Sequence, residues 1–117
     1  MHVTDTHPLI YFFAGQKKLS APAKQIFEDA LSGRGAVYVP VATVWELSML
    51  VSAKKIALAM PFSEWVGQIF EYPGMILYQF DHETLKIFHD PRFHSDPFDR
   101  AIVASALQLG LPLITND

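Results

Sequence analysis

Four short apolar runs alternate with segments of helical periodicity along this chain, and this alternation constrains the fold most. The runs that predict strands are residues 3–5, 36–40, 75–80 and 111–115. The segments that predict helices are residues 7–13, 20–31, 42–53, 62–72, 82–89 and 95–110. Strands separated by helices indicate an α/β fold with a mostly parallel sheet of about four strands and helices on both faces.

Length and composition set the broad class. The chain has 117 residues, 50% of them hydrophobic, so we expect one domain, residues 1–117, with a single core. It has no cysteine, which excludes a disulfide framework and a thiolate metal site. The apolar stretch from Leu9 to Ala14 is too short for a signal peptide or a membrane span. We therefore expect a cytoplasmic protein with no membrane partner.

Capping residues indicate where several helices begin and end. Ser20 is expected to begin the second helix, with Pro22 in its first turn, and Gly33 is expected to end it. Ser63 is a candidate cap for the helix that follows Pro61.

Carboxylates fall at several places where an α/β fold brings chain segments together. Ligands of a parallel sheet gather beyond the carboxyl ends of its strands. Clustered like charges raise the pKa of one another and need a cation to neutralise them. The sequence therefore predicts a divalent-metal site, and hence phosphodiester chemistry. The candidate ligands are Asp5, Glu46, Asp96, Asp99 and Asp117.

The same acids also have structural explanations. Asp96-Pro97-Phe98-Asp99 has the pattern of a helix start, with Asp at the N-cap, Pro next and an acid in the first turn. Asp5 can cap the helix that contains Pro8. Glu46 interrupts an apolar run and is harder to explain in this way. Capping by Asp96 and metal binding by Asp99 are compatible.

Taken together, the segments around these acids resemble the PIN-domain ribonucleases, in particular the VapC-type toxins of bacterial toxin-antitoxin pairs. The resemblance spans essentially the whole chain, and its most specific part is His94 to Arg100. The segments that carry it are Val3-Thr4-Asp5-Thr6-His7, Val44-Trp45-Glu46-Leu47, residues 96–106 and Leu113-Ile114-Thr115-Asn116-Asp117.

The resemblance implies a PIN-like three-layer fold and a site for one or two Mg²⁺ or Mn²⁺ ions. Asp5, Glu46 and Asp99 would be the core acids, Asp117 the fourth acid and Asp96 an additional one. Thr115 would orient ligands or water, and Arg100 would organise the site or meet phosphate. The oxygen-only donor set also favours these hard cations over Zn²⁺.

The implied activity is Mg²⁺- or Mn²⁺-dependent endoribonuclease cleavage by in-line attack of activated water, leaving 5′-phosphate and 3′-hydroxyl ends. A homodimer and a cognate antitoxin are the implied partners. The chain departs from the family by stopping at Asp117, where a further strand is usual. We therefore expect either a truncated sequence or a strand supplied otherwise, since an unpaired sheet edge often recruits another chain.

Net charge neither supports nor excludes RNA as a partner. The formal charge is −3, and it becomes slightly positive when the five candidate ligands are discounted. The lysines at positions 17, 18, 54 and 55 are either RNA contacts or an ordinary solvated face.

There are three alternatives to a ribonuclease. A receiver domain of two-component signalling has a similar length and alternation, but the lysine it needs after the last strand is absent here. A catalytically inactive PIN domain used for protein binding is the second alternative. A zinc site is disfavoured because His82, His89 and His94 lack the spacing of a zinc motif.

Aromatic residues at helical spacing are expected in the core or in subunit contacts rather than in base stacking. They are Tyr11, Phe12, Phe13, Trp45, Trp65 and Phe70.

Overall fold

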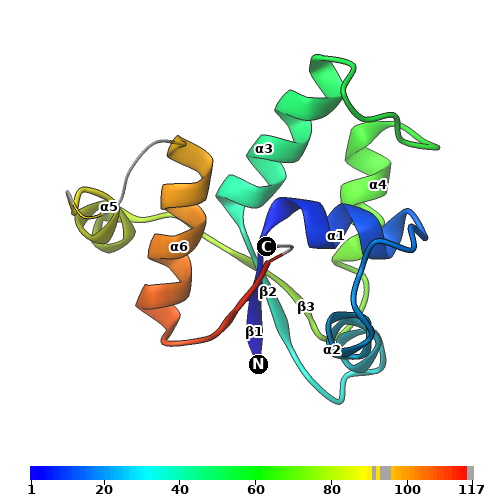
Figure 1. The fold of residues 1–117 in the computed structure, drawn as a ribbon, viewed down its shortest axis with the longest axis horizontal. Coiled ribbons are helices and arrows are strands. Elements are labelled where there is room, and N and C mark those ends of the chain that lie inside the picture. The colour runs from blue at the N-terminus through cyan, green and yellow to red at the C-terminus, as the bar shows by residue number, and fades with distance from the viewer. Residues whose placement is uncertain (91, 93–95, 116–117) are drawn as a thin grey trace.

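A parallel sheet lies at the centre of the structure, a computed structural model that describes residues 1–90, 92 and 96–115 (Figure 1). The strands lie in the order β3-β2-β1-β4, and each neighbouring pair is parallel. The predicted α/β class and four-stranded sheet are confirmed for these residues. The strands are β1 (His2–Thr4), β2 (Val37–Pro40), β3 (Met75–Tyr78) and β4 (Leu113–Ile114).

Helices flank this sheet. In Figure 1, α5 and α6 lie on one side of the strands and α1, α2 and α4 on the other, while α3 lies beyond the end of β2. None of the helices in the described ranges has the length and apolarity needed to cross a lipid bilayer. The helices are α1 (Thr6–Phe13), α2 (Ala21–Ser32), α3 (Val41–Ser52), α4 (Phe62–Ile69), α5 (His82–Phe88) and α6 (Pro97–Leu109).

The capping residues of α2 behave as predicted. The Ser20 hydroxyl accepts a hydrogen bond from the Ala23 N–H at 3.3 Å, which satisfies one of the donors left open at a helix start. At the other end, Gly33 adopts a left-handed conformation with φ of 82°. A residue without Cβ takes this conformation without strain, so the chain turns there.

The limits of α4 differ from the prediction. Ser63 does not cap this helix, because the helix already begins at Phe62 with Pro61 as an N-cap that makes no side-chain bond. The helix ends at Ile69 rather than at Tyr72. A proline follows Tyr72 and disfavours helical backbone in the residue before it, which is one reason for the earlier end.

The strands β1 and β2 run almost directly into helices. A single residue, Asp5, separates β1 from α1, and Pro40 ends β2 immediately before α3 begins at Val41. Both helices therefore start at the carboxyl edge of the sheet. This edge is where parallel α/β folds bind their ligands.

The core forms between the strands and the helices on either side. Strand residues Val3, Val37 and Val39 are fully buried, as expected for strands covered on both faces. Trp65 of α4 is also buried, which confirms a core position for that aromatic residue. Trp45 is 62% exposed, so it is not in the core, and the other predicted position, a subunit contact, stays a prediction for it. Phe12 stacks on the buried ring of Phe27, with their centroids 4.9 Å apart, and this contact joins α1 to α2.

A close backbone approach at Gly74 fixes the start of β3 against α2. The Gly74 N–H donates to the Ala30 carbonyl at 2.9 Å, and its own carbonyl accepts from the Val37 N–H at 2.7 Å. A Cβ at this position would lie 2.3 Å from the Gly35 carbonyl oxygen and 2.4 Å from that of Ala30. Only glycine therefore fits at this junction.

The strand order also decides against the receiver-domain alternative. In that fold β1 lies between β2 and β3. In the described part of this chain β1 lies between β2 and β4, and β3 is at an edge.

Candidate metal centre

Three separate elements bring acidic side chains together beyond the carboxyl edge of the sheet. Asp5 lies between β1 and α1, Glu46 in the second turn of α3, and Asp99 in the first turn of α6. One carboxylate oxygen from each residue lies within 4.8 Å of the other two. Asp5 and Glu46 are half-buried, and Asp99 is exposed. We call these three residues the acidic cluster.

The position of α3 explains why distant segments meet here. This helix packs against both α1 and α6, so it joins the two sides of the sheet at its carboxyl edge. The buried Thr43 hydroxyl donates to the Thr4 carbonyl at 3.1 Å and ties the start of α3 to the end of β1. One turn after Thr43, the side chain of Leu47 is buried in the core. The preceding residue, Glu46, faces the other two acids.

The electrostatics of the cluster are unfavourable without a cation. Burial raises the pKa of the Glu46 carboxyl above its usual value. A hydrogen bond from Thr6 opposes this shift, while the charges of Asp5, Asp99 and Asp96 add to it. Two like charges about 5 Å apart repel by roughly 3 kcal/mol at an effective dielectric constant near 20. The Thr6 hydrogen bond affects the pKa of Glu46 more than the charge of any single neighbouring acid does, but burial has the largest effect, so this pKa stays raised.

The residues present fit a hard divalent cation. Carboxylate oxygens are the donors that Mg²⁺ and Mn²⁺ prefer. Oxygens on opposite sides of one Mg²⁺ are about 4.2 Å apart, because each lies at about 2.1 Å from the ion. The 4.8 Å limit of the acidic cluster exceeds this by only a few tenths of an ångström. Small side-chain movements would therefore let all three acids bind one ion.

A cleft of about 190 Å³ opens beside two of these acids. Its walls include Asp5, Asp99 and Thr115, together with apolar residues of α6 and β4. The predicted supporting residue Thr115 thus lines the same cleft as Asp5 and Asp99. The cleft is large enough for several water molecules or part of a ligand.

Thr6 has a role that the sequence analysis missed. Its side chain is fully buried, and its hydroxyl donates a short hydrogen bond to Oε1 of Glu46. Its N–H donates to Oδ1 of Asp5 at 2.7 Å. One residue therefore orients two of the three acids. The available signal was a threonine directly after Asp5 at the first position of a helix, where a side chain can reach back toward the cap.

Asp96 caps α6 as the local pattern predicts. Its Oδ1 accepts from the N–H groups of Phe98 and Asp99, at 2.8 and 3.1 Å. It lies near enough to raise the pKa of Glu46 but is outside the acidic cluster. The capping explanation is therefore confirmed for Asp96, and its second carboxylate oxygen is not used in these bonds.

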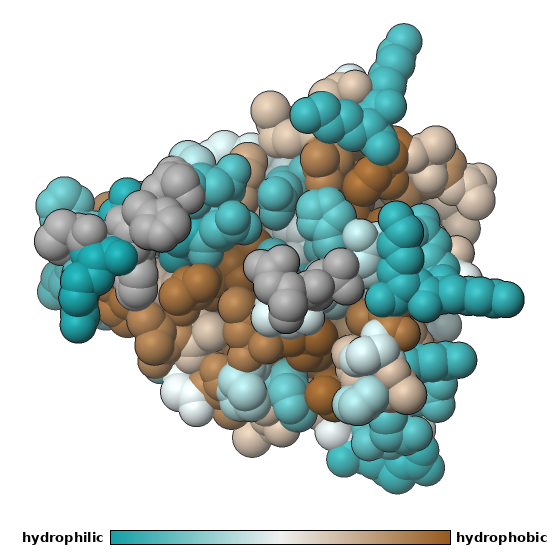
Figure 2. Space-filling view, in the orientation of Figure 1, coloured by the Kyte–Doolittle hydropathy of each residue, from teal (hydrophilic) through white to brown (hydrophobic). Residues whose placement is uncertain are grey.

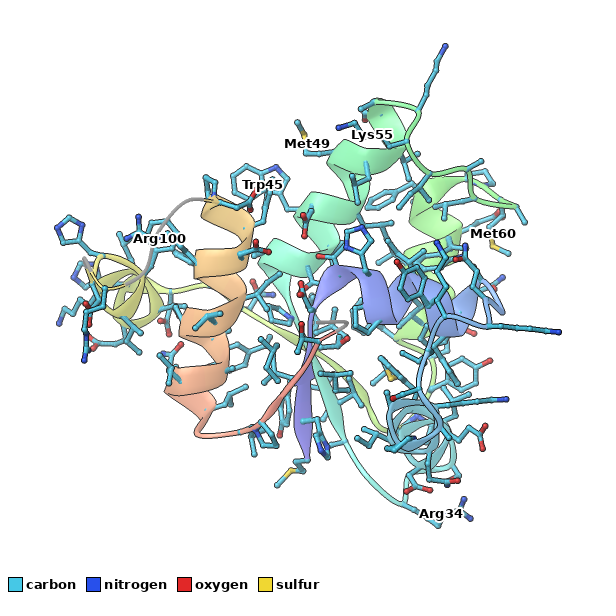
Figure 3. All side chains as sticks on the ribbon, in the orientation of Figure 1. Arg34, Trp45, Met49, Lys55, Met60 and Arg100 are labelled. Carbon is cyan, nitrogen blue, oxygen red and sulfur yellow. The ribbon has the colours of Figure 1, made fainter. Side chains whose placement is uncertain are left out.

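Arg100 lies between α6 and α5 rather than in the cleft (Figure 3). Its Nη2 donates to the Phe88 carbonyl, and its guanidinium carbon lies 4.5 Å from the centroid of the Phe88 ring. A longer hydrogen bond of 3.5 Å reaches the Asp90 carbonyl. These contacts hold the start of α6 against the end of α5. Arg100 thus helps to position the segment that carries Asp99, and contact with phosphate stays a prediction.

Some predicted residues fall outside the described part of the chain. Asp117, the expected fourth acid, is one of them, and so is His94. The other two histidines considered for zinc, His82 and His89, are exposed on and after α5.

Known proteins resemble this chain in both sequence and fold. Ribonuclease VapC22 of Mycobacterium tuberculosis (strain ATCC 25618 / H37Rv) is 28% identical over 113 residues, which is 97% of this chain and 84% of that protein. A toxin-antitoxin complex from Klebsiella pneumoniae contains a chain with a TM-score of 0.66 and 21% identity. That match covers all of this chain and 87% of the other.

A second solved structure agrees in fold. FitAcB from Neisseria gonorrhoeae matches the whole of this chain and 88% of its own, with a TM-score of 0.61 and 22% identity. Most decisively, the family model of the PIN domain matches residues 3–117. The matched region includes every element of the sheet except the first residue of β1, as well as the acidic cluster. The chain therefore belongs to the PIN domain family.

Proposed function

We propose that this chain is a metal-dependent endoribonuclease and the toxin of a toxin-antitoxin pair. The observation that carries the proposal is the convergence of Asp5, Glu46 and Asp99 within 4.8 Å in a PIN domain. The similarity to Ribonuclease VapC22 supports RNA as the substrate. The fold shared with a chain of the toxin-antitoxin complex from Klebsiella pneumoniae supports an antitoxin as the partner.

The acidic cluster would hold one or two Mg²⁺ or Mn²⁺ ions, with Asp96 and Asp117 as further ligands. When bound, such an ion lowers the pKa of a water molecule and polarises a phosphodiester. Thr6 holds the Glu46 carboxylate by a hydrogen bond, and its N–H holds that of Asp5, so these donors are preorganised. Hydrolysis by in-line attack of water leaves 5′-phosphate and 3′-hydroxyl ends.

The lysines have a role in the same proposal. In the described ranges, Lys17, Lys18, Lys54 and Lys55 take part in no ion pair, unlike Lys24 and Lys86. They lie in the segments that follow α1 and α3, two of the three helices whose N-terminal parts lie at the acidic cluster. We propose that they contact RNA phosphates away from the cleaved bond. The assembly we expect is a cytoplasmic homodimer.

The decisive experiment is cleavage of a panel of structured RNAs by the purified protein with Mg²⁺ or Mn²⁺. We expect cleavage that EDTA abolishes, and loss of cleavage in Asp5→Asn and Asp99→Asn with the circular dichroism spectrum unchanged. Glu71→Gln is the matched control, because Glu71 is an exposed acid in the turn between α4 and β3. Retained activity in both Asn variants would refute the assignment.

The same cleavage assay distinguishes the proposed ribonuclease from a catalytically inactive PIN domain. It would show no metal-dependent cleavage of any RNA in the panel, whether or not Mn²⁺ bound to it. End-group analysis of the products tests the reaction itself. Products with a 2′,3′-cyclic phosphate would exclude attack by water.

A further inference from the structure

The cleft of about 190 Å³ between α6 and β4 offers a ligand two kinds of surface. Two acids of the cluster, Asp5 and Asp99, line it directly, and so does Thr115. In Figure 2, hydrophobic side chains lie over α6 and hydrophilic ones between α6 and α3. The other side chains that line the cleft are apolar and come from α6 and β4: Ile102, Val103 and Leu113. A ligand in the cleft therefore contacts metal-binding acids and an apolar wall at the same time.

The size and position of the cleft identify which part of a nucleotide fits. Pockets that enclose a whole small molecule usually measure about 300 to 1,000 Å³, so this cleft takes only part of a nucleotide. A ribose is bonded directly to each side of a phosphodiester, whereas the bases lie one group further away. When the phosphodiester is at the acidic cluster, a ribose is therefore the first group to reach the cleft. Its C–H groups match the apolar wall, and its hydroxyl groups match the polar residues.

We propose that the cleft binds the ribose on one side of the cleaved phosphodiester and that Thr115 forms a hydrogen bond with its 2′-hydroxyl. The inference rests on the proposed ribonuclease function and deepens it, because it assigns the residue that distinguishes RNA from DNA.

Backbone pairing places Thr115 beside the acids. In the ladder between β1 and β4, Thr4 pairs with Ile114, so Asp5 and Thr115 are the next residues in register. The Asp5 N–H donates to the Ile114 carbonyl at 3.0 Å, which continues the pairing past the ends of both strands. Thr115 is therefore held next to Asp5 by the sheet itself.

The proposed reaction makes a binding contact with the 2′-hydroxyl necessary. The attacking group is water and the 3′ oxygen is the leaving group, so the 2′-hydroxyl takes part in neither step. DNA carries the same phosphodiester and would be hydrolysed equally well by such a site. Selection for RNA therefore depends on a group that recognises the 2′-hydroxyl, which is the feature that distinguishes the two nucleic acids.

Thr115 can supply this contact. Among the described residues that line the cleft, it alone has a polar side chain without charge, and it is exposed. Thr4 and Thr6, on either side of Asp5, are fully buried and do not reach a nucleotide. A threonine hydroxyl donates one hydrogen bond and accepts two, so it can bond a 2′-hydroxyl in addition to a protein partner.

The test compares an oligoribonucleotide that the wild type cleaves with two copies of it, each carrying a 2′-deoxyribose on one side of the cleaved bond. We expect the wild type to cleave one of these copies with a kcat/KM about 2- to 10-fold lower, the range for one neutral hydrogen bond. Thr115→Val, of similar shape but without the hydroxyl, should lower kcat/KM on the intact strand by a similar factor. The two changes should not add, because both remove the same contact. Thr115→Ser, which keeps the hydroxyl, should retain the preference for ribose.

Two results would overturn the role of Thr115 while the ribonuclease proposal stands. The first is equal cleavage of the intact strand and of both deoxy copies by the wild type. The second is an equal loss with Thr115→Val on all three strands, since the residue would then act on the metal or on water. In either case Asp99→Asn should still abolish cleavage, which keeps the two proposals apart.

A substitution in the apolar wall tests whether the sugar occupies the cleft. Val103→Phe narrows the cleft and should lower kcat/KM at least about tenfold, because pockets discriminate strongly against a change of size. Its Mn²⁺ affinity, measured by isothermal titration, should stay that of wild type, because no acid is changed. Leu107→Phe is the matched control on α6, since Leu107 is 56% exposed and does not line the cleft. Equal kinetics of the two variants would overturn the ribose site. If Val103→Phe does not fold, the deoxy strands decide alone.

A binding measurement tests the ribose site even if the wild type cleaves no RNA and the ribonuclease proposal fails. Fluorescence anisotropy with Mn²⁺ compares the oligoribonucleotide with an oligodeoxyribonucleotide of the same base sequence. Tighter binding of the ribonucleotide strand by the wild type, lost in Thr115→Val and kept in Thr115→Ser, would support the inference. Equal binding of the two strands, or binding of neither, would overturn it.

Discussion

The buried hydroxyl of Thr6 donates a hydrogen bond to the Glu46 carboxylate, which lies forty positions further along the chain. This contact lowers the pKa of Glu46, against the effect of burial and of the neighbouring acids. It thereby favours the ionised carboxylate, which is the form that binds a cation.

Replacing Thr6 by Val is expected to weaken metal binding. The variant loses the hydrogen bond, so the pKa of Glu46 rises and protons compete better with the ion. Loss of such a supporting contact typically reduces metal affinity by about 10- to 100-fold. Isothermal titration with Mn²⁺ measures the change, which should be larger at lower pH.

Thr43→Val is the matched control for this experiment. The Thr43 hydroxyl is equally buried but donates to the Thr4 carbonyl instead of to an acid. It should therefore lose about 1 kcal/mol of stability with little change in Mn²⁺ affinity. Equal affinities for wild type and Thr6→Val would contradict the role of Thr6.

Bound metal should reverse which protein, wild type or Asp99→Asn, has the higher melting temperature. In EDTA the variant is expected to melt higher, because one of three mutually repelling charges is gone. With Mn²⁺ at about 100 times its Kd, binding adds about 2.7 kcal/mol to the wild type, which then melts higher. Differential scanning calorimetry with and without Mn²⁺ tests the crossover. Glu71→Gln should follow the wild type in both conditions.

Substitutions at Asp96 can separate its capping from its proposed metal role. Asn keeps an oxygen for the cap, so Asp96→Asn should melt like wild type while its Mn²⁺ affinity falls about tenfold. Asp96→Ala should also lose about 1 kcal/mol of stability. Unchanged affinity in Asp96→Asn would leave the residue as a cap alone.

Gly74→Ala is expected to destabilise the fold severely. The added methyl would lie 2.3 and 2.4 Å from backbone oxygens that cannot move without breaking the junction of α2 and β3. We expect the free energy of unfolding to fall by several kcal/mol, more than for ordinary substitutions.

Gly67→Ala in α4 is the control, because its Cβ would meet nothing within 4 Å. It should gain up to about 1 kcal/mol from helix propensity. Urea denaturation compares the two, and similar values would show that the contact at Gly74 is unimportant.

Asp81 should contribute stability that is lost in acid. Its Oδ1 accepts hydrogen bonds from the Thr84 N–H at 2.9 Å and from Gln108 of α6 at 3.2 Å. The backbone bond, followed by the side-chain bonds, holds the pKa of Asp81 below its usual 3.8. A carboxyl whose pKa is lower in the folded state stabilises above its unfolded pKa, and this stabilisation disappears as the pH falls through the folded value.

The measurement for Asp81 is urea denaturation between pH 3 and pH 7. The difference in unfolding free energy between wild type and Asp81→Asn should be constant above about pH 5 and should shrink below about pH 4. Asn retains a capping oxygen, which confines the comparison to the charge. A difference that did not change with pH would rule out the lowered pKa.

Much of the fold was predictable because local chemistry and global topology agree. Ser20 and Gly33 bound α2, and Asp96 begins α6, as their side chains and backbone preferences require. Three of the four predicted strands are longer than those observed, and the first is shifted by one residue, since ladder pairing depends on neighbours that a local pattern does not contain. The same applies to α4, whose start follows Pro61 and not the expected cap Ser63.

The acids of the candidate site could be predicted from the sequence, but the hydrogen bonds that orient them could not. The rule that ligands gather at carboxyl ends of parallel strands brought Asp5, Glu46 and Asp99 together as a hypothesis. The bond from Thr6 to Glu46 depends on how α3 lies across α1, which no local pattern contains. The sequence could not decide between the core and the surface for Trp45 for a related reason, because its helix is apolar on several sides and only packing decides which side faces solvent.

The strand order has a consequence for synthesis on the ribosome. Among the described strands, β1 is made first, yet it holds an inner place in the sheet and pairs on one side with β4, which is made last. Asp99 likewise emerges long after Asp5 and Glu46. The acidic cluster is therefore incomplete until α6 has emerged from the exit tunnel.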